Sequence, residues 1–232
     1  MSTKAKNWLV KNLLPIEAIV FDFDNTIVDE EFSVQQRWNV VLSKYEKTLN
    51  DDSLRRYFFE IYASKGKDYK YHVDDVLKKL NIDIKIKDSI VEDFLKQESI
   101  SESLYPCAEA LINILHKNKF KLAIYTNGDQ KVQERRINLT NIKKYFSYIQ
   151  YGDSYSKKPS KKGFNNLSKN LKLNPKNNFI MIGDSYEEDL IGSSSVNAKC
   201  ILVNCPNKYS DQFPLYANVK DLFDDLKEIL EQ

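Results

Sequence analysis

Hydrophobic residues along the chain alternate between short, uninterrupted runs and stretches with helical spacing. The runs predict buried strands at 18–21, 122–125, 148–150, 179–182 and 200–203. Helical spacing between and after them predicts helices at 107–117, 129–138, 161–171, 187–196 and 219–230. Strands that alternate with helices form right-handed crossovers, so the pattern predicts a parallel α/β sheet, doubly wound and of five or more strands.

One block of the chain interrupts this alternation. From about residue 32 to residue 95, apolar residues recur only at helical spacing, and no run resembles a strand. Most aromatic residues of the block, such as Trp38 and Phe58, fall at that spacing and are predicted to form its own core. We therefore predict a core domain made of 1–28 and 105–232, with an all-helical domain, 29–104, inserted into it.

Composition sets limits on the class of protein. The 232 residues are 42% hydrophobic and 29% charged, which is typical of a soluble globular protein. A net charge of +2 is too small to indicate a nucleic-acid or membrane partner. The cysteines Cys107, Cys200 and Cys205 lack metal-ligand spacing and are interpreted as reduced structural residues. No run has the length of a signal peptide or a membrane span, so we expect a cytoplasmic protein whose first 17 residues form a short packed helix.

Two aspartates directly follow the first predicted strand. Asp22 and Asp24 would be costly in a buried strand unless they lay at its carboxyl end, facing a cleft that contains a cation. Open α/β sheets bind ligands at that edge, where the strand order reverses. The alternative is a pair of solvated turn aspartates, with Asn25 and Thr26 as further turn residues.

The second strand is followed by a hydroxyl and an amide. A phosphate could accept hydrogen bonds from the Thr126 hydroxyl and the amide of Asn127, and Gly128 lets the backbone turn close to a ligand. The alternative is an ordinary strand-to-helix turn in which Asp129 caps the next helix.

A lysine-rich segment, 156–162, follows the third strand. Lys158, held by the following Pro159, could neutralise a phosphoryl oxygen and a neighbouring nucleophile. The alternatives are a solvated loop or a weak nucleic-acid patch.

The fourth strand ends in Gly183-Asp184. Asp22 and Asp184, with a backbone carbonyl, supply the oxygen ligands that Mg²⁺ prefers. Asp189 is assigned to orienting Lys158 or a metal-bound water, whereas Glu187 and Glu188 are interpreted as charges that complement a helix dipole.

The order Asp-x-Asp, Thr-Asn, Lys-Pro, Gly-Asp-x-x-x-x-Asp resembles the haloacid dehalogenase superfamily, in its phosphatase branch. The resemblance runs from about residue 18 to residue 203 and implies a Rossmann-like fold. The helical insertion lies where that family carries a helical cap of the C1 type, which would close over the site and select the substrate. The chain departs from the common family pattern at Asn25, where glycine is frequent, but asparagine tolerates unusual backbone angles.

The resemblance also implies a mechanism. Asp22 is then the nucleophile that forms an aspartyl-phosphate, and Asp24 protonates the leaving oxygen and later deprotonates water. Mg²⁺ is held by Asp22, Asp184 and the backbone carbonyl of Asp24. The phosphoryl group is bound by Thr126, Asn127 and Lys158, with Asp189 in a supporting role.

We therefore predict a Mg²⁺-dependent phosphomonoesterase for a small phosphorylated metabolite such as a sugar phosphate, a nucleotide or a phospho-acid. A carboxyl group two residues after the nucleophile favours phosphate chemistry over dehalogenation, because halide needs no proton on leaving. The alternatives are a phosphomutase with the same residues and a non-catalytic binding protein on this fold. We expect a monomer or homodimer, with neither nucleic acid nor membrane as partner.

Overall fold

The computed structural model describes residues 3–49, 52–65, 69–97, 102–174, 179–205 and 213–231, without the side chains at 3, 62–65 and 69–71. Contacts within the chain divide it into two compact units. The core unit comprises Met1–Glu30 and Ser103–Gln232, and the helical unit comprises Glu31–Glu102. Each unit is described by itself.

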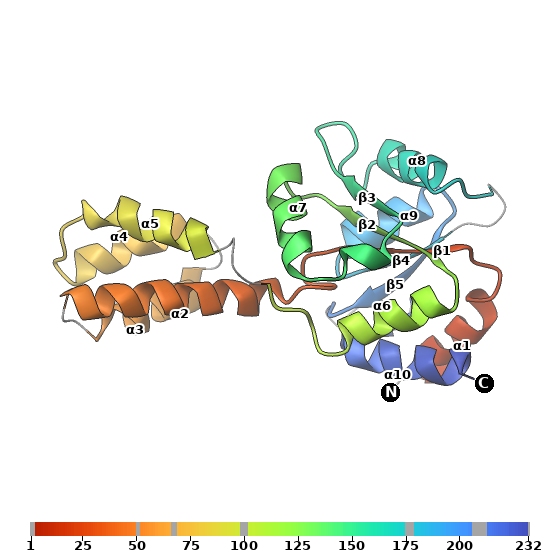
Figure 1. Cartoon of the computed structure of the whole chain (residues 1–232), viewed down its shortest axis with the longest axis horizontal. Coiled ribbons are helices and arrows are strands. Elements are labelled where there is room, and N and C mark those ends of the chain that lie inside the picture. Colours follow the sequence, from red (N-terminus) through yellow and green to blue (C-terminus); the bar gives the residue numbers. More distant parts are fainter. Residues whose placement is uncertain are drawn as a thin grey trace. The chain divides into compact units, whose positions relative to one another are not determined.

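The core unit is built on a parallel sheet with the strand order β3-β2-β1-β4-β5-β6 (Figure 1). The strands are β1 (Ala18–Phe21), β2 (Lys121–Thr126), β3 (Tyr148–Tyr151), β4 (Ile180–Gly183), β5 (Lys199–Val203) and β6 (Leu215–Tyr216). This confirms the predicted doubly wound α/β sheet. The sequence did not indicate β6, because a pair of residues beside β5 is too short to produce a hydrophobic pattern.

Helices cover both faces of the sheet. On one face lie α1 (Thr3–Asn12), α6 (Ala108–Lys117) and α10 (Val219–Leu230), and on the other lies α8 (Lys161–Asn170) (Figure 1). Successive strand residues point to opposite faces, so Ile19 and Phe21 join one apolar cluster while Ala18 and Val20 join the other. Every residue of β1 is buried, which explains its uninterrupted apolar run.

The predicted helix 187–196 has a different form. A π-helical turn, η2 (Tyr186–Ile191), is followed by the short helix α9 (Gly192–Ser194). Ser185 caps this turn, because its hydroxyl accepts a hydrogen bond from the Glu188 amide. Wide turns of this kind occur frequently at functional sites.

Strand β1 is at the centre of the sheet. The chain passes from β1 to β2 and β3 on one side and then to β4 on the other, so the strand order reverses between β1 and β4. The Asp22 amide still donates to the Ile182 carbonyl (2.9 Å), which extends this pairing one residue past β1. Ligands bind outside the carboxyl ends of strands at such a point.

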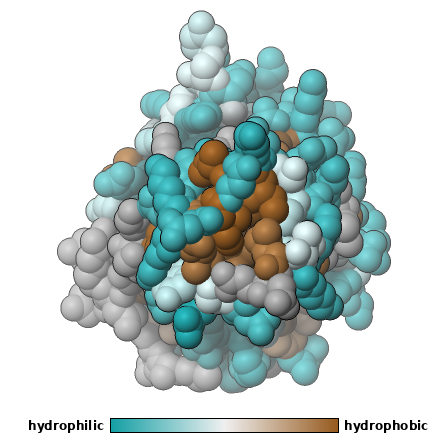
Figure 2. Space-filling model, turned by 90° about the vertical axis from the view of Figure 1, so that its left-hand side faces the viewer, coloured by the Kyte–Doolittle hydropathy of each residue, from teal (hydrophilic) through white to brown (hydrophobic). Residues whose placement is uncertain are grey.

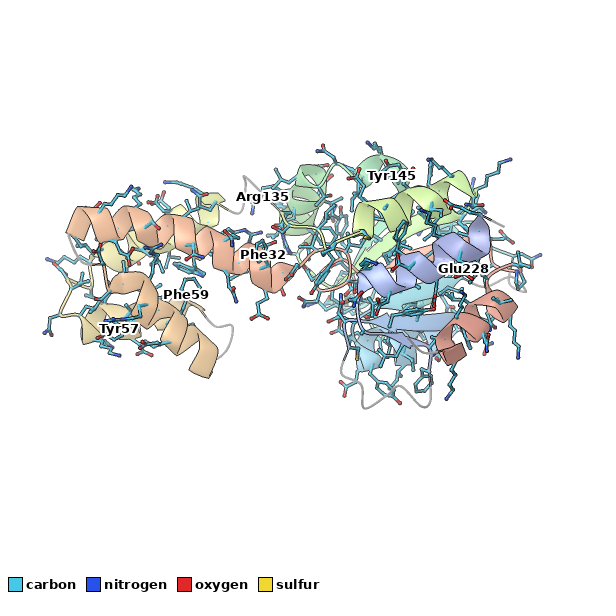
Figure 3. The ribbon with its side chains drawn as sticks, turned by 90° about the horizontal axis from the view of Figure 1, so that it is seen from below. Phe32, Tyr57, Phe59, Arg135, Tyr145 and Glu228 are labelled. Carbon is cyan, nitrogen blue, oxygen red and sulfur yellow. The ribbon has the colours of Figure 1, made fainter. Side chains whose placement is uncertain are left out.

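The helical unit contains α2 (Glu30–Leu49), α3 (Leu54–Lys65), α4 (Tyr69–Lys79) and α5 (Ile86–Gln97). Trp38 is fully buried and stacks on Phe94, with ring centroids 4.1 Å apart, and also contacts Phe58 at 4.5 Å. The prediction that aromatic residues form the core of this block is thus confirmed for Trp38 and Phe58. Tyr57 lies on α3 (Figure 3), and Lys79 Nζ of α4 lies over its ring, 3.7 Å from the ring centroid.

The two segments that connect the units run antiparallel within the core unit. The Asp29 amide donates to the Ser103 carbonyl and the Tyr105 amide donates to the Ile27 carbonyl, both at 2.9 Å.

At the end of the helical unit, apolar residues gather in the centre of the face, with hydrophilic residues around them (Figure 2). Within the described ranges, no helix has the length and apolar character needed to cross a membrane.

Candidate active site

An ion-paired cluster lies at the carboxyl ends of β1 and β4. The ammonium group of Lys158 lies 2.7 Å from Asp22 Oδ1 and 2.6 Å from Asp189 Oδ1. The side chains of Lys158 and Asp189 are completely buried, and that of Asp22 is 11% exposed. Buried charges persist only when they are paired and hydrogen-bonded, so each of these groups depends on the others.

Asp189 is held from two sides. Its Oδ1 accepts from Lys158, and its Oδ2 accepts from the backbone amide of Ser185 (3.0 Å). Gly183 makes this placement possible, because a Cβ at that position would lie 2.1 Å from Asp189 Oδ2. The glycine before Asp184 is therefore required by packing against Asp189.

Asn127 fixes the backbone that carries Lys158. Its Oδ1 accepts from the Lys158 amide (2.7 Å), and its Nδ2 donates to the Lys158 carbonyl (3.0 Å) and to Glu188 Oε2 (2.9 Å). The side-chain amide that the sequence assigned to phosphate binding thus has protein partners. Glu188, interpreted only as a dipole charge, contributes to this clamp.

Three carboxylates gather in one place. Oxygen atoms of Asp22, Asp184 and Asp189 all lie within 4.8 Å of one another. Burial raises the pKa of Asp184 to about 6, and the charge of Asp189 adds to this effect. Burial also raises the pKa of Asp22 well above its usual value, although Lys158 opposes the shift. Burial alone would lower the pKa of Lys158, but the charges of Asp22 and Asp189 outweigh it and raise the pKa.

Asp24 lies in a second network, which the sequence did not predict. Gln133 Nε2 donates to Asp24 Oδ2 at 2.6 Å, and Arg136 Nη1 forms an ion pair with Asp24 Oδ1 at 2.7 Å. The latter contact lacks the angles of a hydrogen bond. Both partners are on α7 (Gln130–Leu139), at a spacing of three residues that places them on one face of the helix.

Thr126 ends β2 and is 1% exposed. Its hydroxyl oxygen accepts from the Gly128 amide (3.2 Å) and from Gln133 Nε2 (3.1 Å), so the hydroxyl proton can still be donated to a ligand. Asp129 caps α7 through the amides of Lys131 and Val132, as the alternative interpretation of this turn required. The turn after β1 has Asn25 at φ 55°, a left-handed conformation that asparagine tolerates.

Known phosphatases resemble this chain in sequence and in fold. The chain is 22% identical to the glyceraldehyde 3-phosphate phosphatase of Methanothermobacter thermautotrophicus, over 93% of this chain and 100% of that protein. It is 26% identical to the phosphoglycolate phosphatase of Aquifex aeolicus, over 62% of this chain and 65% of that protein. The crystal structure of a HAD phosphatase from Thermococcus onnurineus superimposes with a TM-score of 0.58 at 24% identity, covering 93% of this chain and 98% of that one.

A parallel sheet with three acids and a lysine at its switch point defines a Rossmann-like α/β protein with a charged site at that edge. Residues 19–203 match the sequence profile of the family described as haloacid dehalogenase-like hydrolase. The chain belongs to this family, which confirms the resemblance drawn from its motifs.

Proposed function

We propose that this protein is a Mg²⁺-dependent phosphomonoesterase that hydrolyses a small phosphorylated metabolite through an aspartyl-phosphate on Asp22. The observation that carries the proposal is the contact of Asp22 with Lys158 at the strand switch point, beside Asp184 and Asp189. The named relatives, which are phosphatases, support the same class of reaction.

The donor set fits a divalent cation. Asp22, Asp184 and Asp189 place three carboxylates around one ammonium group, which leaves an excess of two negative charges when all are ionised. Burial raises the pKa values of Asp22 and Asp184 in the metal-free protein, and repulsion from the neighbouring carboxylates adds to this effect. Hard oxygen donors of this kind suit Mg²⁺, with the backbone carbonyl of Asp24 as a further ligand. Bound there, the ion would neutralise phosphoryl charge and bring the anionic substrate close to Asp22.

Side chains of this protein would carry out both chemical steps, formation and hydrolysis of the aspartyl-phosphate. Asp22 attacks phosphorus while the bond to the alcohol oxygen breaks, and the Asp24 carboxyl group gives its proton to that oxygen. Thr126 and Lys158 hold the equatorial phosphoryl oxygens. Asp24, now a carboxylate, takes a proton from the water that releases phosphate from Asp22. In this scheme Asp189 and Asn127 keep Lys158 in place.

The helical unit is proposed to act as a cap that selects the ester. The residues of the core site bind the phosphoryl group, so the choice among sugar phosphates, nucleotides and phospho-acids would depend on residues outside that site. The substrates in the names of the two relatives suggest that two- and three-carbon phosphates should head the panel.

A phosphate-release screen tests the proposal. The purified protein is incubated with a panel of phosphomonoesters in Mg²⁺ and in excess chelator, alongside Asp22→Asn and Asp24→Asn. We expect release in Mg²⁺ only, loss of turnover in Asp22→Asn, and an acid-stable phosphoenzyme that accumulates in Asp24→Asn because its hydrolysis is slowed.

A second assay separates the alternatives on the same fold. Chloride release from 2-chloropropionate would identify a dehalogenase, and phosphate exchange between sugar positions without net release would identify a mutase. Phosphate release from the best ester by Asp22→Asn at the wild-type rate would refute covalent catalysis by Asp22.

A further inference from the structure

We propose that Gln133 and Arg136 are positioning residues that fix the carboxyl group of Asp24 for proton transfer to the departing alcohol. The proposal rests on the proposed function, because it concerns the acid–base residue of that reaction. It assigns a role to one face of α7, a helix that otherwise lies outside the cluster around Lys158.

The two residues hold both oxygens of Asp24. Gln133 Nε2 donates to Oδ2 at 2.6 Å, and Arg136 Nη1 lies 2.7 Å from Oδ1. A carboxyl group gripped at both oxygens cannot rotate freely about its terminal bond. Its orientation is therefore set by α7, and the turn that carries Asp24 does not need to set it.

The two positioning residues also hold each other. Arg136 Nη1 donates to Gln133 Oε1 at 3.0 Å, so the side-chain amide of Gln133 can turn only one way and must present Nε2 to Asp24. The same Nε2 donates to Thr126 Oγ1 at 3.1 Å. Gln133 thereby joins the acid–base residue to the hydroxyl group proposed to bind the phosphoryl group.

Burial makes this network rigid. Gln133 is 3% exposed and Arg136 is 6% exposed, and the guanidinium carbon lies 5.4 Å from the centroid of the Phe23 ring. A buried guanidinium requires a charged or strongly accepting partner, and the Asp24 carboxylate forms an ion pair with it. Displacement of Arg136 would break the ion pair with Asp24, and displacement of Gln133 would remove the hydrogen bond to Asp24 Oδ2.

Gly128 makes room for the network. A Cβ at this position would lie 2.2 Å from Gln133 Nε2 and 2.6 Å from Gln133 Cγ, so any larger residue must push this side chain away. Gly128 therefore leaves space for the side chain that positions Asp24, in addition to allowing the backbone to turn. Gly128→Ala perturbs the network while both positioning residues stay in the chain.

The role predicts a dependence on the leaving group. In the first step the P–O bond to the alcohol breaks and Asp24 gives a proton to that oxygen. A poorly acidic alcohol needs this proton, whereas 4-nitrophenolate leaves without it. kcat/KM reports only the steps up to departure of the alcohol, so it isolates this proton transfer from the later hydrolysis of the phosphoenzyme.

The experiment measures kcat/KM for phenyl phosphate and for 4-nitrophenyl phosphate, two aryl esters that differ by one nitro group and in the acidity of the alcohol, and it compares each variant with the wild type on both. For Arg136→Met, Gln133→Met and Gly128→Ala, we expect kcat/KM to fall at least about tenfold more for phenyl phosphate. Arg136→Lys, which keeps the charge, should recover part of the loss. Arg135→Met is the matched control on the exposed side of α7 (Figure 3) and should leave the ratio unchanged.

The outcomes separate the two proposals. Equal losses on both esters, or no loss, would overturn the positioning role, because a purely structural defect does not sense the leaving group. If circular dichroism shows that Arg136→Met does not fold, the results for Gln133→Met and Gly128→Ala test the positioning role. Hydrolysis of both esters by the wild type but not by Asp22→Asn upholds the proposed function whatever these variants do.

Discussion

Replacement of Asp189 by asparagine tests the cluster around Lys158 most directly. The two side chains have nearly the same shape, so Asp189→Asn changes charge and hydrogen bonding without creating a cavity. Both oxygens of Asp189 accept hydrogen bonds, one from Lys158 Nζ and the other from the Ser185 amide. Asparagine has one oxygen and one NH₂ group, so it can satisfy only one of these two donors.

The introduced side-chain amide will adopt the less costly of two orientations, and that orientation determines the loss of stability. An NH₂ group turned toward Lys158 would leave a buried ammonium facing a donor, and the loss of such a partner costs about 3–5 kcal/mol. An NH₂ group turned toward the Ser185 amide leaves one buried N–H unpaired, which costs about 1–3 kcal/mol. We therefore expect a loss of about 2 kcal/mol with the oxygen facing Lys158. For a chain of this length, that loss corresponds to a fall in Tm of about 4–8 °C.

The assay is thermal unfolding in saturating Mg²⁺, together with phosphate release. Saturating metal is needed because removal of one of three clustered carboxylates also relieves their repulsion in the metal-free protein. Activity should fall about tenfold or more, because the ammonium of Lys158 loses one of the two carboxylates that aim it. Glu187→Gln, an exposed acid-to-amide change on the same turn, is the control and should have little effect.

Equal Tm and activity in Asp189→Asn and Glu187→Gln would refute this reasoning. Such a result would mean that the buried oxygens of Asp189 do not hold Lys158. Gly183→Ala supplies an independent check, because its Cβ would displace the same carboxylate.

Three further predictions concern other parts of the molecule. The pKa of Asp184 is raised from 3.8 to about 6, so its contribution to stability is present at low pH and is lost as pH rises through about 6. Metal-free protein should melt at a lower temperature at pH 7 than at pH 5 by differential scanning fluorimetry, a difference that Asp184→Asn should reduce. Trp38→Ala removes the ring stacked on Phe94 and should lower stability by about 3–5 kcal/mol in urea unfolding; an unchanged midpoint would contradict that packing. Tyr125→Phe removes the hydroxyl that donates to the Ser156 carbonyl and should cost about 1 kcal/mol in the same assay, and no change would show that this bond adds nothing.

The sheet and the positions of the acids were predictable because they follow simple periodicity. An uninterrupted apolar run such as 18–21 indicates a strand buried on both faces, and in a parallel sheet the residues after such runs meet at one edge. Asp22 and Asp184 follow two strands that are direct neighbours. Lys158 could be distinguished from the other lysines of its segment only because a proline follows it and because the other motifs supplied a nucleophile for it to contact.

Other contacts could not be predicted, because they depend on the angles at which elements pack. Asn127 and Gln133 are ordinary polar residues near the start of a helix, and no pattern in the sequence shows that one clamps the Lys158 backbone and the other the Asp24 carboxyl group. Arg136 would be assigned to a solvated helix face by its charge. Gly128 was the one signal of this network in the sequence. A glycine can indicate that another group lies close to the backbone, but it does not identify that group.

The two networks divide the charges of the site in a way that matches the proposed reaction. The carboxyl group of Asp24 has its own cation in Arg136 and is not one of the three clustered carboxylates, so it is supported whether or not a metal is bound. Lys158 forms ion pairs with Asp22 and Asp189, and Asp184 lies beside them, so these three carboxylates with one ammonium group keep an excess of negative charge. The nucleophile therefore depends on a divalent cation before it can accept an anionic ester, whereas the orientation of the acid–base residue does not. It follows that removal of Mg²⁺ should abolish formation of the phosphoenzyme while leaving the Asp24 contacts with α7 intact.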